Sequence, residues 1–188
     1  SLAVYSGVKA TSQYFVYKAE RISDLETAKS YYENAALLDP ANPSPNISFG
    51  LRLMQETLYG EAAAEIQKAI DKGLYTSIVY SHLTTAHILA GQFQEAELAL
   101  ARACEIYPQS VFVRVRYGVV LKENGNEKEA EKQFETARRL NVKQAETWLS
   151  LITEGGLNTA EKAKNNKQIL PLTELRPGQN VFAVLSER

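Results

Sequence analysis

The sequence predicts an all-α protein in which antiparallel helix pairs stack into a right-handed superhelical solenoid. Small residues recur at a period of 34, so that Gly91 corresponds to Gly125 and Ala103 to Ala137. Within each period, apolar residues follow spacings of three and four, which are typical of helices. Glycines and prolines interrupt these segments at regular positions. Because a single two-helix repeat leaves an apolar face uncovered, such repeats are stable only when neighbours stack.

The period divides the chain into frames at 9–42, 43–76, 77–110, 111–144 and 145–178. In the third and fourth frames a glycine, Gly91 or Gly125, separates two predicted helices of about a dozen residues each. We therefore expect one helical-repeat domain over residues 1–170, with about four repeats and a degenerate fifth one at 145–170. An extended C-terminal tail is expected at 171–188.

Turn-forming segments mark the ends of the first three frames. The segment "DPANPSP" (39–45) ends the first frame. Within that frame, the segment up to Lys18 is expected to be helical. The segments "DKGLYTS" (71–77) and "YPQS" (107–110) end the second and third frames. Proline lacks a backbone N–H and restricts the residue before it, so the prolines stop the helices that precede them.

One local conflict lies in the fourth frame. Its segment "VFVRVRYGVV" (111–120) alternates and is rich in β-branched residues, which locally favours a strand. The repeat register instead requires the first helix of the frame at this place. We follow the register, because β-branched residues lower helix propensity by only a few tenths of a kcal/mol each.

The fifth frame opens with a short helix around Trp148 that is expected to end at Gly155. The segment "NTAEKAKNNKQIL" (158–170) is expected to form a second helix that stops before a proline. Its polar outer face is typical of a terminal capping repeat. The tail beyond it contains one apolar cluster, Val181 to Leu185.

The recurring alanines are explained by packing. Ala96 and Ala103 lie seven residues apart, which is two turns along one face of the second helix of their frame. A small side chain at such a position lets the first helix approach closely. A bulky one would overpack the contact, at a cost of about 1–3 kcal/mol.

The repeats resemble the tetratricopeptide repeat (TPR) family. The period and the pattern W-x-x-L-G-x-x-Y…A-x-x-x-F…A…P are matched over residues 9–144. In the second frame, for example, Phe49-Gly50 stands at the Leu-Gly position and Ile66 at the Phe position. The sequence departs from the family at the tryptophan position, which carries Ser12, Asn46, Tyr80 and Arg114. The closing proline is replaced in the second and fourth frames by Leu74 and Val142.

The resemblance implies a non-catalytic scaffold that binds a protein or peptide in a concave groove, lined by the first helix of each repeat. Carried over residue by residue, the groove contains Tyr17, Ile47, Leu51, Met54, Ile78, Thr85, Ile88, Phe112, Val115 and Val119. The same stripe continues through Gln13, Glu20, Ser81, Glu146 and Leu149. One subgroup of the family holds a peptide's terminal carboxylate with a Lys/Asn/Arg clamp. The corresponding positions carry Gln13, Tyr17, Ser48 and Phe112, which argues against that mode.

Three arrangements are compatible with an apolar groove of this extent, which would be a large exposed patch for a monomer. An amphipathic or apolar segment of another protein lies in the groove, and this is the leading expectation. Alternatively, the chain's own residues 181–185 fold back into it. In the third arrangement the superhelix is tight, and the groove residues pack against each other.

The sequence also resembles the soluble repeat tail of bacterial membrane-embedded O-antigen ligases and polymerases. The resemblance rests on "LDPANP" (38–43), "SVFVRVRYGVVL" (110–121) and "AETWLSLI" (145–152). It implies that the chain is part of a glycan-transferring membrane protein without carrying its catalytic residues. On that hypothesis a missing N-terminal region tethers the segment to the membrane.

Composition limits the partners. The net charge of −1 gives no reason to expect nucleic acid or an anionic membrane. The single cysteine, Cys104, allows no internal disulfide, so the compartment, cytoplasmic or periplasmic, stays open. No apolar run reaches the roughly 18 residues of a membrane helix, so we expect no membrane insertion of this segment.

Catalytic and metal-binding patterns are weak, and we expect neither a cofactor nor an enzyme site. His82 and His87 lie five residues apart, a spacing unsuited to joint metal binding on a helix. We expect His87 to pack between helices, His82 to be exposed and Cys104 to be a buried, inert thiol. Four arginines form a modest basic cluster, which surface salt bridges explain more simply than nucleic acid: Arg114, Arg116, Arg138 and Arg139.

Overall fold

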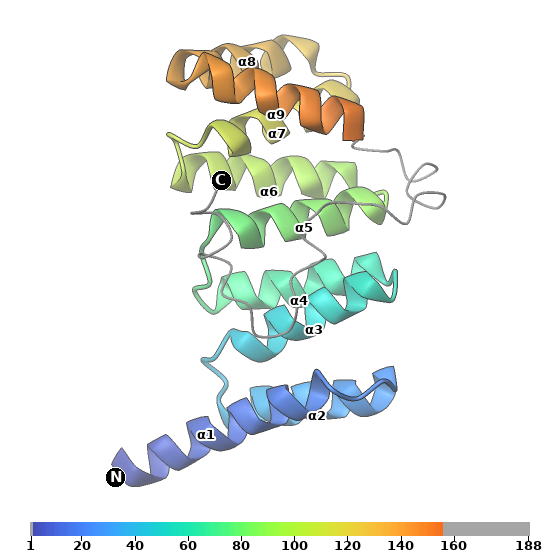
Figure 1. The fold of residues 1–188 in the computed structure, drawn as a ribbon, viewed down its shortest axis with the longest axis vertical. Coiled ribbons are helices and arrows are strands. Elements are labelled where there is room, and N and C mark those ends of the chain that lie inside the picture. Colours follow the sequence, from blue (N-terminus) through green and yellow to red (C-terminus); the bar gives the residue numbers. More distant parts are fainter. Residues whose placement is uncertain (1, 156–188) are drawn as a thin grey trace.

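The structure, a computed structural model, describes the backbone of residues 2–155 and the side chains of residues 6–152. Over this range the chain is helical and contains no strand. Its helices are α1 (Leu2–Ala19), α2 (Leu25–Leu38), α3 (Ser44–Gln55), α4 (Tyr59–Asp71), α5 (Ser77–Leu89), α6 (Phe93–Ile106), α7 (Val111–Glu123), α8 (Glu127–Leu140) and α9 (Val142–Gly155). They stack in pairs along the long axis of the molecule (Figure 1).

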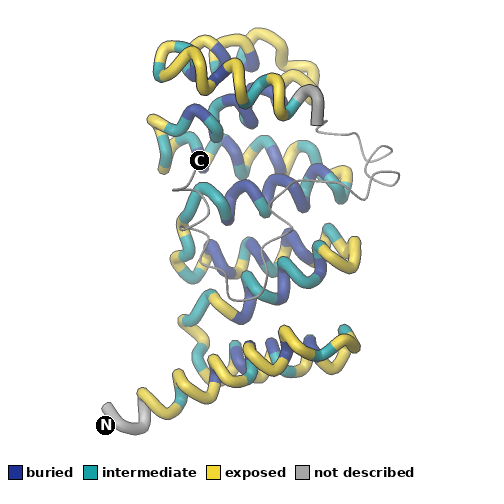
Figure 2. The backbone as a smooth tube through the Cα atoms, in the orientation of Figure 1, coloured by how far each residue is buried: buried dark blue, intermediate teal, exposed yellow. Residues whose placement is uncertain are grey.

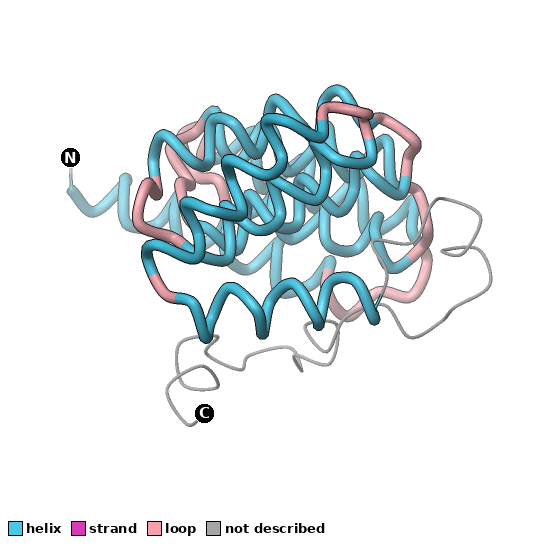
Figure 3. The backbone as a smooth tube through the Cα atoms, turned by 90° about the horizontal axis from the view of Figure 1, so that it is seen from above, coloured by secondary structure: helices cyan, strands magenta, loops and turns pink. Residues whose placement is uncertain are grey.

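The pairs α1–α2, α3–α4, α5–α6 and α7–α8 correspond to the first four frames, and α9 packs on both α7 and α8. The second helix of one pair packs on the first helix of the next, for example α4 on α5 and α6 on α7. In a view along the stack, the loops gather at the two ends of the helices (Figure 3). The predicted solenoid of antiparallel helix pairs is therefore confirmed.

Side-chain caps start three of the helices. Asp24 accepts from the Thr27 backbone N–H at 2.8 Å and starts α2, and Thr76 starts α5 in the same way. Ser110 accepts from the Val113 N–H and starts α7. Each cap satisfies a backbone donor and contributes about 1 kcal/mol. The segment 111–120 is therefore helical, as the register requires, despite its β-branched residues.

The recurring small residues have two separate physical causes. Gly91 and Gly125 follow α5 and α7 with φ of 76° and 82°, a conformation that strains residues with a side chain. The recurring alanines lie where helices approach, and Ala96 and Ala130 are at most 1% exposed. Gly118 also belongs to the second class, because a Cβ on it would clash with the Phe134 ring.

Buried residues occur in every helix pair of the stack (Figure 2), in one large cluster and two smaller ones around α7, α8 and α9. Aromatic residues link the first pair to the second: Tyr32 on α2 stacks on Phe49 on α3, with ring centroids 5.2 Å apart. The main cluster runs from Val16 on α1 to Val120 on α7. This cluster gives the first helices of the repeats a rigid support, and these helices carry the predicted groove.

At the C-terminal side, α9 begins at Val142, before the frame boundary at 145, and extends to Gly155, the last residue whose backbone is described. The expected capping helix at 158–170 and the expected tail at 171–188, with its apolar cluster, lie outside the described residues. The domain limits therefore stay a prediction. In the part that the structure describes, no helix combines the length and the apolar character needed to cross a membrane.

Candidate partner-binding face

The structure divides the ten predicted groove residues by exposure. Tyr17 is exposed, at 50% of its surface. Five large apolar side chains are half-buried, and we call them the apolar strip: Ile47, Leu51, Met54, Ile78 and Phe112. The remaining four are buried in the fold: Thr85 at 8%, Ile88 at 4%, Val115 at 0% and Val119 at 8%.

The four buried residues stabilise the stack and present no free surface. Val115 packs in a cluster with Ala137 and Ala145, and Val119 packs in one with Phe134. Ile88 belongs to the main core. For Val115 and Val119 the cause is α9, which packs on α7. Thr85 on α5 is buried beside Arg116, whose Nη2 donates to it. At these four positions the side chains pack inside the stack and offer little surface to a partner.

The apolar strip is the part of the predicted groove that keeps accessible surface. Three of its residues, Ile47, Leu51 and Met54, share one face of α3 at spacings of four and three. Ile78 and Phe112 are equivalent positions, each the second residue of its helix. The strip thus follows the first helices of three successive repeats.

Phe112 also belongs to a shallow depression between the starts of α7 and α9. Its ring lies 4.6 Å from the ring of Trp148, measured between centroids. Polar side chains line the same depression, among them Gln109, Lys143 and Thr147. The apolar strip therefore continues into a mixed aromatic and polar surface on α9, which suits a ligand that is partly apolar.

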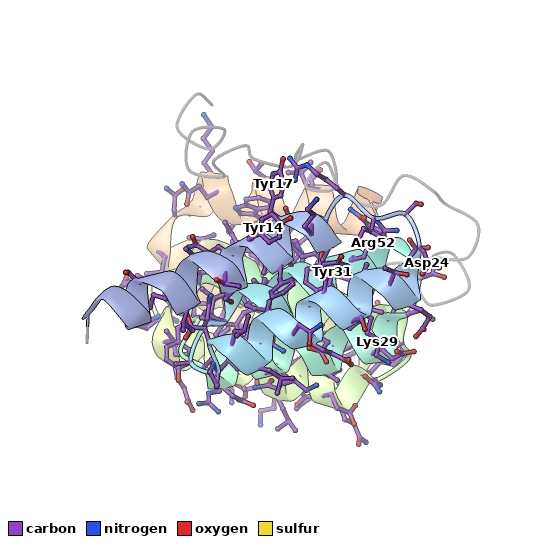
Figure 4. The ribbon with its side chains drawn as sticks, turned by 90° about the horizontal axis from the view of Figure 1, so that it is seen from below. Tyr14, Tyr17, Asp24, Lys29, Tyr31 and Arg52 are labelled. Carbon is purple, nitrogen blue, oxygen red and sulfur yellow. The ribbon has the colours of Figure 1, made fainter. Side chains whose placement is uncertain are left out.

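Tyr17 differs from the apolar strip in its chemical surroundings. The Arg21 guanidinium lies 3.4 Å from the centroid of its ring, so the exposed ring carries a cation on one face. Arg21 also donates to the Tyr17 carbonyl at 3.1 Å. Figure 4 shows Tyr14 and Tyr17 together on α1, and Tyr14 is likewise exposed at 52%. The first repeat thus presents tyrosines and cations instead of aliphatic side chains.

A residue that sequence reasoning placed in the surface cluster is instead buried beside the strip. Arg116 on α7 is only 4% exposed. Its Nη1 donates to Ser81 Oγ at 3.1 Å, and its Nη2 donates to Thr85 Oγ1 at 3.0 Å and to the Ser81 carbonyl at 3.5 Å. Its Nε has no hydrogen-bond partner. The guanidinium carbon lies 5.6 Å from the centroid of the Phe112 ring.

Burial sets the ionisation of this site. It lowers the pKa of Arg116 to about 10, so the guanidinium stays charged at neutral pH. Burial, assisted by the charge of Arg116, lowers the pKa of His82 to about 4, so this imidazole is neutral at pH 7. The prediction that His82 is exposed is wrong, because the side chain is half-buried. The site holds one positive charge.

The salt-bridge interpretation of the basic cluster holds for two of its four members. Arg138 pairs with Glu131 at 3.1 Å and with Glu146 at 2.8 Å, and Arg139 pairs with Glu135. Arg114 donates to the Pro108 carbonyl and to Gln133, neither of which is charged. In the described part of the chain, Arg116 donates to neutral acceptors only. Its spacing of four from Phe112 was the available signal that it lies beside the groove.

The described residues offer little for catalysis. His87 Nδ1 lies 2.8 Å from Gln92 Oε1, next to the turn that follows α5. Burial raises the pKa of the half-buried Cys104 thiol to about 11, which disfavours the reactive thiolate. Among the described residues, no three metal-ligating side chains come together. The arrangement can bind a segment of chain, but it shows no nucleophile with a base.

No model of a known protein family matches the sequence, and no curated protein matches it either. Solved structures do match. The crystal structure of YrrB, a TPR protein with an unusual peptide-binding site, aligns with a TM-score of 0.56 at 22% identity, over 82% of this chain and 78% of that chain. MamA aligns with a TM-score of 0.60 at 19% identity, over 85% of this chain and 88% of that chain.

A third similar structure is Naa15/Naa10 bound to HypK-THB, with a TM-score of 0.58 at 14% identity, over 70% of this chain and 20% of that chain. At such identities the likeness establishes the fold and nothing beyond it. The chain therefore has a TPR-like fold.

Proposed function

We propose that this chain is a non-catalytic scaffold that binds an apolar segment of another protein along the apolar strip. The proposal is carried by one observation: large apolar side chains on the first helices of three successive repeats stay half-buried, while the other predicted groove residues on α5 and α7 are buried. YrrB, which shares the fold, has a peptide-binding site, and this supports the proposal by analogy.

Binding at the strip has a favourable energetic basis. Burying a Leu, Ile or Phe side chain completely contributes about 1.5–3 kcal/mol, and a few such anchors carry most of the energy of an interface. Ile47 and Phe112 pack with one side against the main core, which holds them in place before a partner arrives. A preformed surface loses little conformational entropy on binding.

The first prediction concerns Leu51. We expect Leu51→Asp to fold, because this side chain is half-buried, and to weaken binding about tenfold or more through loss of an apolar anchor. Random twelve-residue peptides selected by display on the full chain serve as ligands. Fluorescence anisotropy gives their Kd, and circular dichroism checks the fold. Leu98→Asp is the control, since Leu98 lies on α6 and is 71% exposed.

The competing arrangements give different results. If Leu51→Asp and Ile78→Asp both unfold the chain, the strip is packing and the proposal fails. If both variants fold and bind the peptides as tightly as the unchanged chain, the site is elsewhere. A synthetic peptide of residues 171–188 tests the tail, which we expect not to compete with the selected peptides.

The resemblance to O-antigen ligase tails stays a prediction from the sequence, because none of the structures compared above bears on it. An apolar strip for a protein segment is compatible with a free scaffold and with a domain of a larger membrane protein. The sequence upstream of Leu2 would distinguish them.

A further inference from the structure

Arg116 is a buried positive charge whose acceptors among the described residues are all neutral. The three oxygens around it belong to Ser81 and Thr85: two hydroxyls and one backbone carbonyl. The Phe112 ring adds a weak attraction for the cation. Removing a cation from water costs several kcal/mol, and a fold usually offsets this cost with a carboxylate. Here the cost is largely uncompensated.

The remaining donor capacity of the guanidinium suits a carboxylate. Its five N–H groups form a planar fork, and the Nε–H among them has no acceptor. A carboxylate accepts two parallel N–H bonds from such a fork, and these charge-assisted bonds are about twice as strong as bonds to neutral oxygens. The hydroxyls of Ser81 and Thr85 rotate freely, so they change from accepting to donating when an anion replaces them.

The position of Arg116 connects it to the proposed ligand. Arg116 follows Phe112 by one helical turn, and its hydrogen bonds cross from α7 to α5, the two helices that carry Phe112 and Ile78. A segment bound along the apolar strip crosses these two helices beside the Phe112 ring, which Arg116 contacts from the buried side. Neutral His82 beside it adds no second positive charge at pH 7.

We propose that Arg116 selects partners by pairing with an Asp or Glu side chain in the apolar segment that binds along the strip. This inference rests on the proposed function and adds a charge requirement to it. The ligand is thus an apolar segment with one acidic side chain at a fixed distance from its anchors. The carboxylate accepts from the Nε–H of the guanidinium and from one Nη, where it replaces a hydroxyl as acceptor.

The test uses the full chain and the displayed random peptides described above. Peptides selected on the unchanged chain should carry an Asp or Glu at one fixed spacing from apolar residues. Replacing that acid by its amide in a synthetic peptide should weaken binding about tenfold to a hundredfold, as expected for a hydrogen bond to a charged group. On Arg116→Gln the same replacement should change the Kd less than about twofold.

The matched control is Arg114→Gln, which removes an arginine from the same helix and should leave the acid-to-amide penalty intact. Arg116→Lys keeps the positive charge but lacks the planar guanidinium. On this variant the acid-to-amide replacement should weaken binding more than on Arg116→Gln and less than on the unchanged chain. Arg116→Gln should melt at a temperature no lower than the unchanged chain, because a buried cation is removed. Arg116→Met is the second replacement if Arg116→Gln does not fold.

Several results would overturn the inference and leave the proposed function intact. One is a set of selected peptides that depends on Leu51 but contains no acidic residue. Another is an acid-to-amide penalty that is equal on Arg116→Gln and on the unchanged chain. Failure of both Arg116→Gln and Arg116→Met to fold would show that Arg116 is structural.

Two further outcomes also count against it. The peptide of residues 171–188 could compete with the selected peptides and lose this ability on Glu174→Gln. The acid that pairs with Arg116 would then belong to the chain's own tail. If no displayed peptide binds the unchanged chain, the proposed function and the inference fail together.

Discussion

At the scale of single residues, the positive charge of Arg116 helps to keep His82 neutral. Burial, with the nearby guanidinium, keeps the pKa of His82 at about 4 in the folded chain, against 6.5 in a model compound. Between these values the unfolded chain binds a proton that the folded chain does not. Stability is therefore unaffected above pH 6.5 and falls as the pH decreases from 6.5 towards 4.

This linkage gives a prediction for His82. We expect the free energy of unfolding in urea to fall by about 2 kcal/mol between pH 7 and pH 5, a range in which most carboxylates stay ionised. His82→Asn should remove this fall, and Arg116→Gln should reduce it without abolishing it, since burial remains. His87→Asn is the control and should retain the fall. An unchanged pH dependence in His82→Asn would contradict the assignment.

Residue identity was predictable where packing or backbone geometry imposes it. The period of 34 identified Ala96, Ala130 and Gly125, because each position tolerates only a small residue or a positive φ. Arg116 was not identified, because arginine is an ordinary surface residue and its sequence neighbours do not reveal its burial. Only the structure shows that its acceptors come from α5, about one repeat earlier in the chain.

At the scale of helices, the register predicted α7 better than its local composition did. The β-branched run at 111–120 is helical because Ser110 caps it and because α6, α8 and α9 all pack against it. The same burial explains the error in the predicted groove. Residues of α7 were assigned to an open surface by analogy between repeats, but the position of α9 makes this repeat different.

The approach of α7 to α8 gives a second prediction. We expect Gly118→Ala to destabilise the chain by about 1–3 kcal/mol, because the added methyl group overlaps the buried Phe134 ring. Phe134→Leu should recover part of this loss when combined with it, and urea denaturation of the four chains in the cycle measures the coupling. Gly60→Ala is the control: nothing lies within 4 Å of its Cβ, so it should be neutral or slightly stabilising. Additive losses at Gly118 and Phe134 would contradict the proposed contact.

At the scale of the whole molecule, each repeat depends mainly on its neighbours in the stack. Such an array behaves approximately as a one-dimensional chain of units joined by interfaces, and its end units have one interface fewer. Within the described residues, α9 is the last helix of the stack, and its contact with α7 includes the Trp148–Phe112 pair. Trp148 is the chain's single tryptophan, so its fluorescence reports on that end alone.

This architecture gives the last prediction, which separates the end of the array from its centre. In urea, the fluorescence of Trp148 should change at a lower midpoint than circular dichroism at 222 nm, which averages over all helices. The control is the double variant Trp148→Phe/Tyr80→Trp, which moves the probe to a buried position on α5, in the third repeat. Its fluorescence midpoint should equal or exceed the dichroism midpoint. Coincident midpoints in both chains would mean that the stack unfolds as one cooperative unit, with interfaces stronger than the repeats that they join.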